Sequence, residues 1–328
     1  MANEKVKKPA GTPPKAAVIL GKGGVTEAGW HAVGDAFRCM KAYQLGKVRG
    51  ISQPQVQTPL PLAIGTLLHA GRARWFARRF RTDDEVWREM QQAMQDAAVN
   101  ERLPISREAE LTALSLIQQY VEHWKMRPLP DPKAAEYKLM ASLAPEGTHA
   151  PWAARTARLD DASIYEEAGG KLAIGEAKTT SADIDAVVRE YELHGQPLLQ
   201  QLLWKLDPRG EARFGPAAGF VLDVTVKPES KGGKAKFGRV FIPVNQRALL
   251  WYQANMIHKL QQVQQVTWDS EVPRSPAGCT FMAGRARIDC AFKPLCSHGR
   301  AATGGYVLPG GQSLLNKEHW KGETPPWE

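Results

Sequence analysis

Lys171-Leu172-Ala173-Ile174-Gly175-Glu176-Ala177-Lys178-Thr179 is an apolar run that ends in charged residues, and an earlier run, Trp152 to Leu159, ends at Asp160. Between the two lies Glu166-Glu167-Ala168-Gly169-Gly170, a segment rich in turn-forming residues. Short apolar runs that are bounded by turn residues are typical of β-strands. The sequence therefore predicts a β-hairpin that brings Asp160 alongside the second run.

The charged residues of this hairpin point to metal-assisted chemistry on a phosphate. Glu176 and Lys178 are two residues apart, so on a strand both side chains lie on one face. With Asp160 they supply two carboxylates, which are hard ligands for Mg²⁺ or Mn²⁺, and an ammonium that can orient water and offset phosphate charge. The alternative is a surface hairpin with an ordinary Glu/Lys pair. Contact with the apolar Leu172-Ala173-Ile174 favours the catalytic interpretation, because unpartnered charges are costly there.

This pattern resembles the PD-(D/E)XK nuclease superfamily, and in particular its RecB-like exonuclease branch, which includes CRISPR-associated and phage recombination exonucleases. The resemblance runs from about Cys39 to Cys296. It implies an α/β fold with a restriction-endonuclease-like core, a mixed central sheet flanked by helices. It also implies that Asp160 and Glu176 bind the metal and that Lys178 is the catalytic lysine. Asp160 is preferred to its neighbour Asp161 because the family places this acid directly after an apolar residue.

A histidine lies upstream in Ile64-Gly65-Thr66-Leu67-Leu68-His69, inside an apolar stretch from Pro61 to Phe80 with helical spacing. On this helix Gly65, His69, Arg72 and Phe76 share a face. The pattern resembles the G-x-x-x-H helix of the family, which implies that His69 adds a nitrogen ligand to the metal. The alternative is a core histidine with a satisfied hydrogen bond.

Three further residues are candidates for DNA contact or active-site support. A helix is expected to begin at His194-Gly195-Gln196-Pro197, because proline suits a first helical turn. Gln200 and Trp204 follow one turn apart and resemble the family's Q-x-x-x-Y motif, with Trp in place of Tyr; packing in the core is the alternative for Trp204. Glu136, on a strand expected near residues 134–140, is either an outer carboxylate of the site or part of a cross-strand ion pair.

The chain contains four cysteines, Cys39, Cys279, Cys290 and Cys296. Four thiolates in a reducing compartment suit zinc or an iron-sulfur cluster, and four buried unligated thiols are the alternative. The arrangement of one cysteine near the start and three near the end resembles that of the iron-sulfur RecB-like nucleases. In these proteins a 4Fe-4S cluster joins an N-terminal helix to the C-terminal tail. The interval between Cys279 and Cys290 is longer than the family's commonest pattern. Zinc therefore stays the alternative to the cluster.

The composition favours a nucleic-acid partner and no membrane. The net charge is +9, and no apolar run approaches the roughly 18 residues of a membrane span. Without a signal-peptide pattern we expect the cytoplasm of a bacterium or of a phage-infected host. Basic side chains gather in three segments, which form either a phosphate-tracking groove or a solvated face; they include Arg72, Arg74, Arg78, Arg79, Arg81, Lys227, Lys231, Lys234, Lys236, Arg239, Arg285, Arg287 and Lys293.

The chain divides into four predicted parts. Residues 1–24 form a flexible basic tail, 25–130 a helical region with Cys39 and His69, 131–270 the nuclease core, and 271–328 a tail that carries the remaining cysteines and loses order from about Leu308. Helices are expected at 28–45, 62–80, 84–99, 107–125 and 246–266, and strands at 219–226 and 238–243.

The resemblance implies a Mg²⁺- or Mn²⁺-dependent DNA exonuclease that processes ends for recombination or repair. Its partners would be single-stranded or duplex DNA ends and a single-strand annealing protein, a helicase or another recombination factor. The alternative is a non-catalytic or partner-dependent DNA-binding factor on the same scaffold. The sequence has no G-x-x-x-x-G-K-[ST] phosphate loop, so ATP hydrolysis is not expected.

Overall fold

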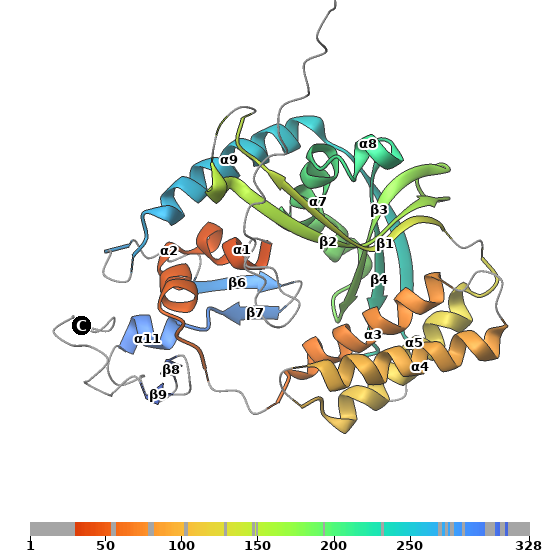
Figure 1. The fold of residues 1–328 in the computed structure, drawn as a ribbon. Coiled ribbons are helices and arrows are strands. Elements are labelled where there is room, and N and C mark those ends of the chain that lie inside the picture. The colour runs from red at the N-terminus through yellow and green to blue at the C-terminus, as the bar shows by residue number, and fades with distance from the viewer. Residues whose placement is uncertain are drawn as a thin grey trace, which may run out of the picture.

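The structure is a computed structural model, shown in Figure 1. It describes residues 30–53, 57–77, 82–101, 104–127, 130–145, 148, 150–192, 194–230, 233–267, 271–272, 275, 279–283, 286–298, 306–308 and 312–313. The predicted basic tail and residues 314–328 lie outside the described residues, as do Arg78, Arg79, Arg81, Lys231 and Arg285.

A five-stranded mixed sheet forms the centre of the fold. Its order follows the sequence, and all neighbours are antiparallel except the parallel pair β3 and β4. The strands are β1 (Asp131–Ser142), β2 (Ala154–Tyr165), β3 (Lys171–Thr180), β4 (Gly219–Val226) and β5 (Lys236–Pro243). The predicted hairpin of β2 and β3 is confirmed. The expected end of the first strand was wrong, because β2 continues through Asp160 to Tyr165.

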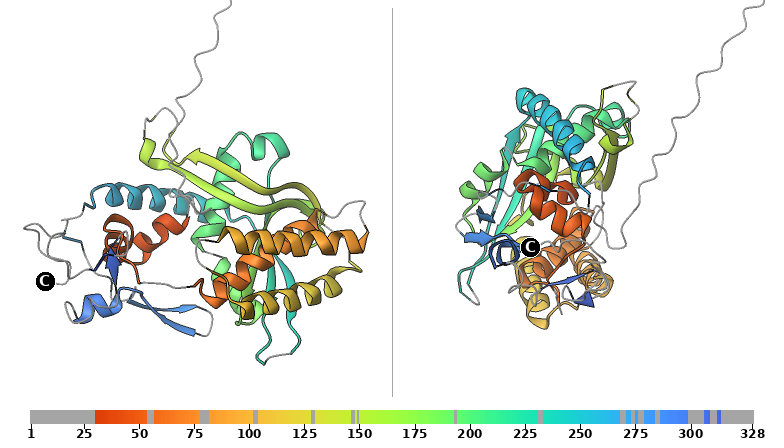
Figure 2. Two further views of the ribbon diagram at one scale, coloured as in Figure 1. Left: turned by 60° about the horizontal axis from the view of Figure 1, so that its bottom comes forward. Right: turned by 90° about the vertical axis from the view of Figure 1, so that its left-hand side faces the viewer.

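Helices lie on both sides of this curled sheet, as the views in Figures 1 and 2 show. One group packs as a three-helix unit with its own core: α3 (Leu60–Phe76), α4 (Asp83–Asn100) and α5 (Arg107–Trp124). The starts of α4 and α5 are fixed by local residues. Thr82 and Glu85 form a capping box at α4, and at α5 the Ser106 side chain accepts a hydrogen bond from the Ala109 backbone N–H. The other group comprises α6 (Ile184–Tyr191), α7 (Gly195–Leu206), α8 (Glu211–Phe214) and α9 (Gln246–Gln264).

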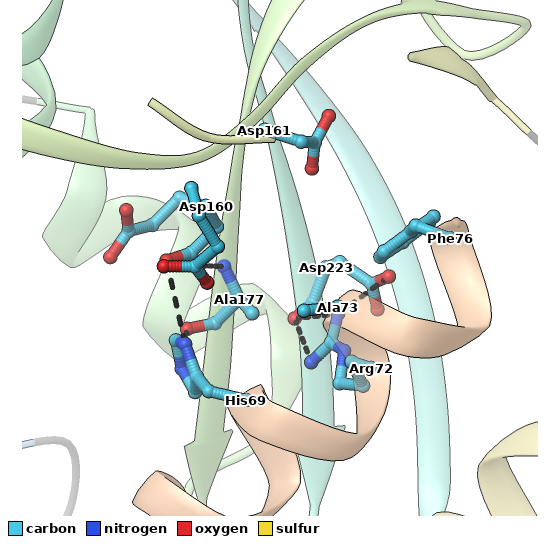
Figure 3. A pocket seen from close by; sticks show the side chains of 10 residues that line it. His69, Arg72, Ala73, Phe76, Asp160, Asp161, Ala177 and Asp223 are labelled. Carbon is cyan, nitrogen blue, oxygen red and sulfur yellow. Dashed lines mark hydrogen bonds and ion pairs between the residues drawn. The ribbon is translucent and has the colours of Figure 1, made fainter. Parts of the chain in front are cut away.

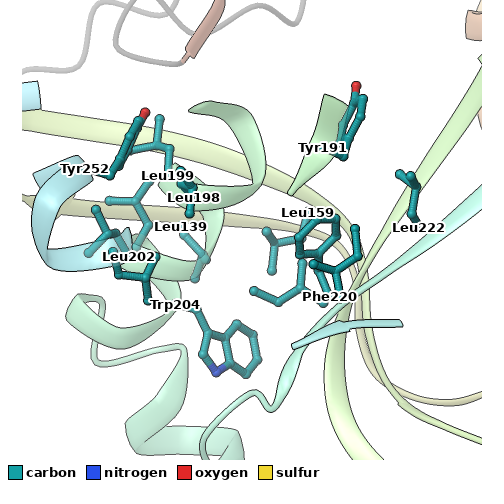
Figure 4. Packing of buried hydrophobic residues seen from close by; sticks show 14 of the residues in the cluster. Leu139, Leu159, Tyr191, Leu198, Leu199, Leu202, Trp204, Phe220, Leu222 and Tyr252 are labelled. Atoms are coloured by element: carbon teal, nitrogen blue, oxygen red, sulfur yellow. The ribbon is translucent and has the colours of Figure 1, made fainter. Parts of the chain in front are cut away.

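The largest hydrophobic cluster lies between the sheet and the second helix group. Figure 4 shows α7 contributing Leu198, Leu199, Leu202 and Trp204 to it, beside leucines of the strands. Nine of the ten residues from Gly195 to Trp204 are buried, and Gln196 is half-buried. The helix is therefore a central packing element, which fixes its first turn against β3.

The N-terminal helices meet the C-terminal part of the chain. Instead of the single helix expected over residues 28–45, the chain forms α1 (Trp30–Arg38), α2 (Met40–Tyr43) and a π-helical turn, η1 (Gln44–Val48). The break falls at Cys39, whose backbone is extended (φ −159°, ψ 116°). Leu45 and Ile51 pack here against Leu295 and Tyr306.

The C-terminal part contains a small hairpin that the sequence did not predict. It is formed by β6 (Thr280–Ala283) and β7 (Ala286–Asp289), followed by α11 (Lys293–His298) and the short pair β8 (Val307–Leu308) and β9 (Gln312–Ser313). A short 3-10 turn, η2 (Pro151–Ala153), precedes β2. Among the described residues, no helix is long and apolar enough to cross a membrane.

Candidate active site

In both β1 and β2 the alternation of inward-facing and outward-facing side chains is interrupted at one point. The candidate site lies at this point. In β1 the residues that face the main core are Ala134 and then Tyr137, and in β2 they are Ala162 and then Leu159, so the two-residue alternation is interrupted in both strands. The interruption falls at Glu136 and Asp160. Glu136 has φ +49°, the only positive φ of a non-glycine residue in the described part of the chain. Such a conformation costs free energy and is concentrated at functional sites.

A pocket opens at this point between the sheet and α3 (Figure 3). Its lining carries many acidic side chains, and α3 closes it with residues of about two successive helical turns. The lining residues are His69, Arg72, Ala73, Phe76, Glu136, Asp160, Asp161, Glu176, Ala177 and Asp223. The predicted shared face of His69, Arg72 and Phe76 is thus observed, whereas Gly65 does not line the pocket.

His69, Asp160 and the backbone of Ala177 are in mutual contact. The β2–β3 register is paired as far as Asp161 and Gly175, and just beyond it the Asp160 side chain accepts a hydrogen bond from the Ala177 N–H at 2.7 Å. His69 Nδ1 lies 3.4 Å from Asp160 Oδ1, and its Nε2 lies 3.1 Å from the Ala177 carbonyl oxygen. Figure 3 shows the three groups converging on one spot. A ligand there would meet a carboxylate, an imidazole and a carbonyl together.

The charges in this contact stabilise one another. The carboxylate of Asp160 raises the pKa of His69 above its ordinary value, and burial opposes this effect only in part. Burial alone would raise the pKa of Asp160, but His69, the Ala177 N–H and Lys178 together outweigh it and lower that pKa. Asp160 is therefore held as a carboxylate, which is the form that binds a cation.

Glu176 and Lys178 form a second contact group with the start of α7. Lys178 Nζ lies 2.7 Å from Glu176 Oε1. The side-chain amides of Gln196 and Gln200 donate to Glu176 Oε1 at 2.6 Å and Oε2 at 2.8 Å. Burial alone would lower the pKa of Lys178, but Glu176 and then Tyr191 outweigh it, so that pKa is raised and the ammonium is retained. The predicted support from Gln200 is thus a direct contact with Glu176.

Gln196 belongs to this contact group, although in the sequence it indicated only the start of a helix. It contacts Glu176, and its Oε1 lies 3.4 Å from Lys178 Nζ. The available signal was its spacing: Gln196 and Gln200 are four residues apart at the start of α7, so their amides share one helix face.

Trp204, in contrast, is not at the site. It is 1% exposed, its indole N–H donates to the Gly215 carbonyl at 3.0 Å, and its ring stacks with Phe214. A base cannot reach it, and its burial matches core packing, the alternative considered for this residue. Its place in the sequence fits the periodicity of the core face of α7 equally well.

Glu136 takes both of the positions considered for it. Its carboxylate forms a cross-strand ion pair with Arg158, and it also lines the pocket. Burial and the nearby Asp160 raise the pKa of Glu136, although Arg158 opposes the shift. The side chain is therefore an acidic group at the rim of the site, covered by one arginine.

Asp161 is held apart from the His69 contact. Its carboxylate accepts from Ser163 Oγ at 2.6 Å and from Tyr165 Oη at 2.8 Å, and burial raises its pKa to about 6. The opposite residue is Gly175, where an added Cβ would clash with Asp161 Oδ2. The missing side chain at Gly175 thus makes the space that the Asp161 carboxylate occupies.

A buried ionic network anchors α3 on the sheet one turn after His69. Asp223 Oδ2 lies 2.6 Å from an Arg72 guanidinium nitrogen and 3.0 Å from Arg239 Nε, and it accepts from Tyr120 Oη at 2.6 Å. The arginine side chains are each 3% exposed. The expectation that Arg72 and Arg239 line a phosphate-tracking groove was therefore wrong. Asp223 pairs with Ala177 in the β3–β4 register, so the network fixes α3 beside the pocket.

No tight cluster of three His, Cys, Asp or Glu side chains suited to a metal ion occurs among the residues that the structure describes. The reason at the pocket is that Glu176 is turned onto Lys178, Gln196 and Gln200 rather than onto Asp160. The metal assignments of His69, Asp160 and Glu176 stay predictions.

The cysteines lie in one region of the fold. The backbone N–H of Cys290 donates to the Cys279 carbonyl at 2.8 Å, and burial raises the pKa of the Cys290 thiol, with smaller contributions from Cys39 and Cys279. Cys296 lies on α11, which packs against the N-terminal helices through Leu295. Cys39, Cys279 and Cys290 thus lie near one another, and no group of three potential metal ligands occurs among the residues that the structure describes.

A scan against protein-family models and a search of curated proteins find no match to this chain. Among solved structures, a crystal structure of a "putative exonuclease" from Eubacterium rectale is similar to it, with a TM-score of 0.41 and 11% sequence identity. The similarity covers 84% of this chain and 85% of that one.

Proposed function

We propose that this chain is a metal-dependent nuclease of the PD-(D/E)XK type, RecB-like branch, that hydrolyses phosphodiester bonds of DNA. The observation that supports the proposal is the contact of His69, Asp160 and the Ala177 backbone. Ala177 is the residue between Glu176 and Lys178, so His69 and Asp160 contact the same β-strand segment that carries these two residues, which supports the proposal. An exonuclease that acts on DNA ends in recombination or repair is the form of this activity that we favour.

The donor atoms at the pocket fit Mg²⁺ or Mn²⁺. Asp160 and Glu176 would supply carboxylate oxygens, Ala177 a carbonyl oxygen and His69 an imidazole nitrogen, which is an oxygen-rich set with one nitrogen. Glu176 accepts three hydrogen bonds or ion pairs, and a carboxylate has about four acceptor positions, so one is left for a cation. When bound, the ion would lower the pKa of a water molecule and stabilise the leaving oxygen.

The protein groups around it have separate tasks in this proposal. Lys178, held by Glu176 and Gln196, would orient the attacking water and offset charge that develops on the phosphate. Gln196 and Gln200 fix the direction of the Glu176 carboxylate. The Arg72–Asp223 ion pair holds α3 on the sheet and thereby fixes His69.

We also propose that the four cysteines bind a 4Fe-4S cluster, with zinc as the alternative. The break in the N-terminal helix puts Cys39 beside the C-terminal part, where the backbone N–H of Ser275 lies 3.5 Å from its sulfur. Thiolates are suitable ligands for either metal. Iron and sulfide assays on anaerobically purified protein decide between them, since bound zinc without iron would contradict the cluster.

The test of the nuclease is digestion of end-labelled single- and double-stranded linear DNA with Mn²⁺, Mg²⁺ or EDTA. The wild type is compared with Lys178→Ala, and with Lys171→Ala as a matched control, because Lys171 is an exposed lysine at the start of the same strand. We expect metal-dependent shortening that Lys178→Ala abolishes and Lys171→Ala retains. Cutting by Lys178→Ala at the wild-type rate would refute the assignment. Binding without cleavage on every substrate would favour a non-catalytic DNA-binding factor.

A further inference from the structure

Two basic side chains lie opposite one another on the outer face of the β1–β2 ribbon. Lys138 and Arg158 are direct partners in the register. Lys138 is exposed, and the side chain of Arg158 is 60% exposed. Like charges at directly opposite positions destabilise a sheet, and of the two only Arg158 has an acidic partner, Glu136, among the described residues. The pair is therefore better explained by an anionic ligand than by the stability of the sheet.

The pair lies on the same face as the pocket and next to it. Arg158 is two residues from Asp160, and Lys138 is two residues from Glu136, so both basic residues lie beside the point where the alternation is interrupted. The ion pair of Arg158 with Glu136 shows that the Arg158 side chain lies on the side of the pocket, since Glu136 lines the pocket. Two residues of a strand span about 7 Å. A group bound by the pair would thus be a near neighbour of a group bound at Asp160.

Because the pocket is acidic, binding of a polyanion there requires basic side chains close to it. Its acidic lining residues outnumber its basic ones, and the buried guanidinium of Arg72 is taken up by Asp223. A polyanion that crosses the pocket therefore requires cations outside it. Lys138 has no ion-pair partner among the described residues, and Arg158 has Glu136 at the rim. An arginine can exchange a carboxylate for a phosphate in the same bidentate geometry.

We propose that Lys138 and Arg158 bind the phosphates of a nucleic-acid strand that flank the phosphodiester at Asp160. This inference rests on the proposed nuclease function and specifies its substrate as a polymer strand rather than a mononucleotide. The two side chains project from paired strands, so together they form a short basic track that leads away from the pocket along the ribbon.

The test measures binding rather than cleavage. A fluorescently labelled single-stranded DNA is titrated with full-length protein in EDTA at several salt concentrations, and an RNA of the same sequence forms a second arm. Wild type is compared with Lys138→Gln, Arg158→Gln, the double variant and Lys171→Gln, an exposed lysine of the same sheet outside the track. Each lost phosphate contact lowers the salt slope of log Kd by about 0.7 on a single strand, so the double variant should lower it by about 1.4.

The outcomes separate this inference from the nuclease proposal. A reduced slope in the double variant, with Lys171→Gln unchanged and thermal unfolding as in the wild type, supports the track even if no metal gives cleavage. An unchanged slope in the double variant overturns the track even if the wild type cuts DNA. Failure of the wild type to bind either strand also overturns it. Equal losses on DNA and RNA would assign the track to the shared phosphate backbone, and a loss on DNA alone would assign it to DNA.

Discussion

The Asp160 carboxylate accepts a hydrogen bond from the Ala177 backbone N–H at 2.7 Å, just where the regular pairing of β2 and β3 ends. A side chain thus replaces the next backbone bond of the ladder. Its second oxygen stays directed at His69, 3.4 Å away. The Asp160 side chain therefore has two roles. It satisfies the Ala177 amide, which would otherwise lose its partner, and it presents a charged oxygen to the pocket.

Asp160→Asn is expected to keep the fold and lose cleavage. The amide oxygen of Asn can still accept from Ala177, but the negative charge that binds a cation is gone. Metal assistance contributes several kcal/mol to such reactions, so we expect a fall in rate of about 100-fold or more. Mn²⁺ binding by calorimetry should weaken in parallel. Asp161→Asn should lose less, because both oxygens of Asp161 already accept from Ser163 and Tyr165. A larger loss in Asp161→Asn would exchange the roles of the two residues.

Gln200→Leu should reduce cleavage without unfolding the chain. Gln200 donates to Glu176 at 2.8 Å, and partners that orient a metal-binding carboxylate typically contribute 10- to 100-fold to affinity or activity. The matched control is Gln201→Leu, since Gln201 is the adjacent buried glutamine and makes no contact with Glu176 among the described residues. The measurement is the DNA cleavage rate of each variant under saturating Mn²⁺. Equal losses would show that the effect belongs to α7 packing and not to Glu176.

Much of the fold could be predicted because its signals are local. The hairpin follows from two apolar runs and a glycine-rich turn, and α4 and α5 begin at residues that cap their own helices. The break at Cys39 could not be predicted in this way. The surrounding segment has the composition of a helix, and its interruption coincides with packing of Leu45 and Ile51 against the C-terminal part. Contacts distant in sequence decided that element.

The same distinction holds at the site. Glu176, Lys178 and Gln200 were predictable because strand and helix periodicity put them on defined faces. Arg72 and Asp223 were not, since their ion pair joins a helix and a strand 151 residues apart. In the sequence Arg72 is one of several neighbouring arginines. Nothing in its spacing distinguishes a buried guanidinium from an exposed one.

Asp223→Asn is expected to destabilise the protein strongly. Burial alone would raise the pKa of Asp223, but Arg72 and Arg239 outweigh it and lower that pKa, so the network depends on its charge. Removing one partner leaves buried guanidinium groups uncompensated, at a cost of about 3–5 kcal/mol. Urea unfolding measures the loss. Glu122→Gln, which breaks the exposed pair with Lys125, should change stability by no more than about 0.5 kcal/mol. Similar values for both variants would contradict a tightly buried network.

The Asp207 carboxylate is expected to make the free energy of unfolding depend on pH. It lies at the end of α7, is 1% exposed, and accepts from the Met140 N–H at 2.7 Å and from the Arg209 guanidinium at 2.7 Å. Burial would raise its pKa, but the hydrogen bonds from Arg209 and Met140 outweigh this effect, and the pKa is lowered. A lowered pKa means that the contribution is complete above the unfolded value of about 3.9 and is lost as the pH falls through the folded value.

Asp207→Asn should therefore cost about 1–3 kcal/mol near neutral pH, because hydrogen bonds to a buried carboxylate are lost or weakened. The difference from the wild type should shrink as the pH falls from about 3.9 through the lowered pKa of folded Asp207, because the unfolded wild type is protonated at this residue before the folded wild type. Urea unfolding from pH 7 down to pH 3 follows it, with Asp131→Asn as the control, whose carboxylate is exposed and pairs with Lys133. A difference that stays constant over this range would mean that Asp207 acts through its shape and not its charge.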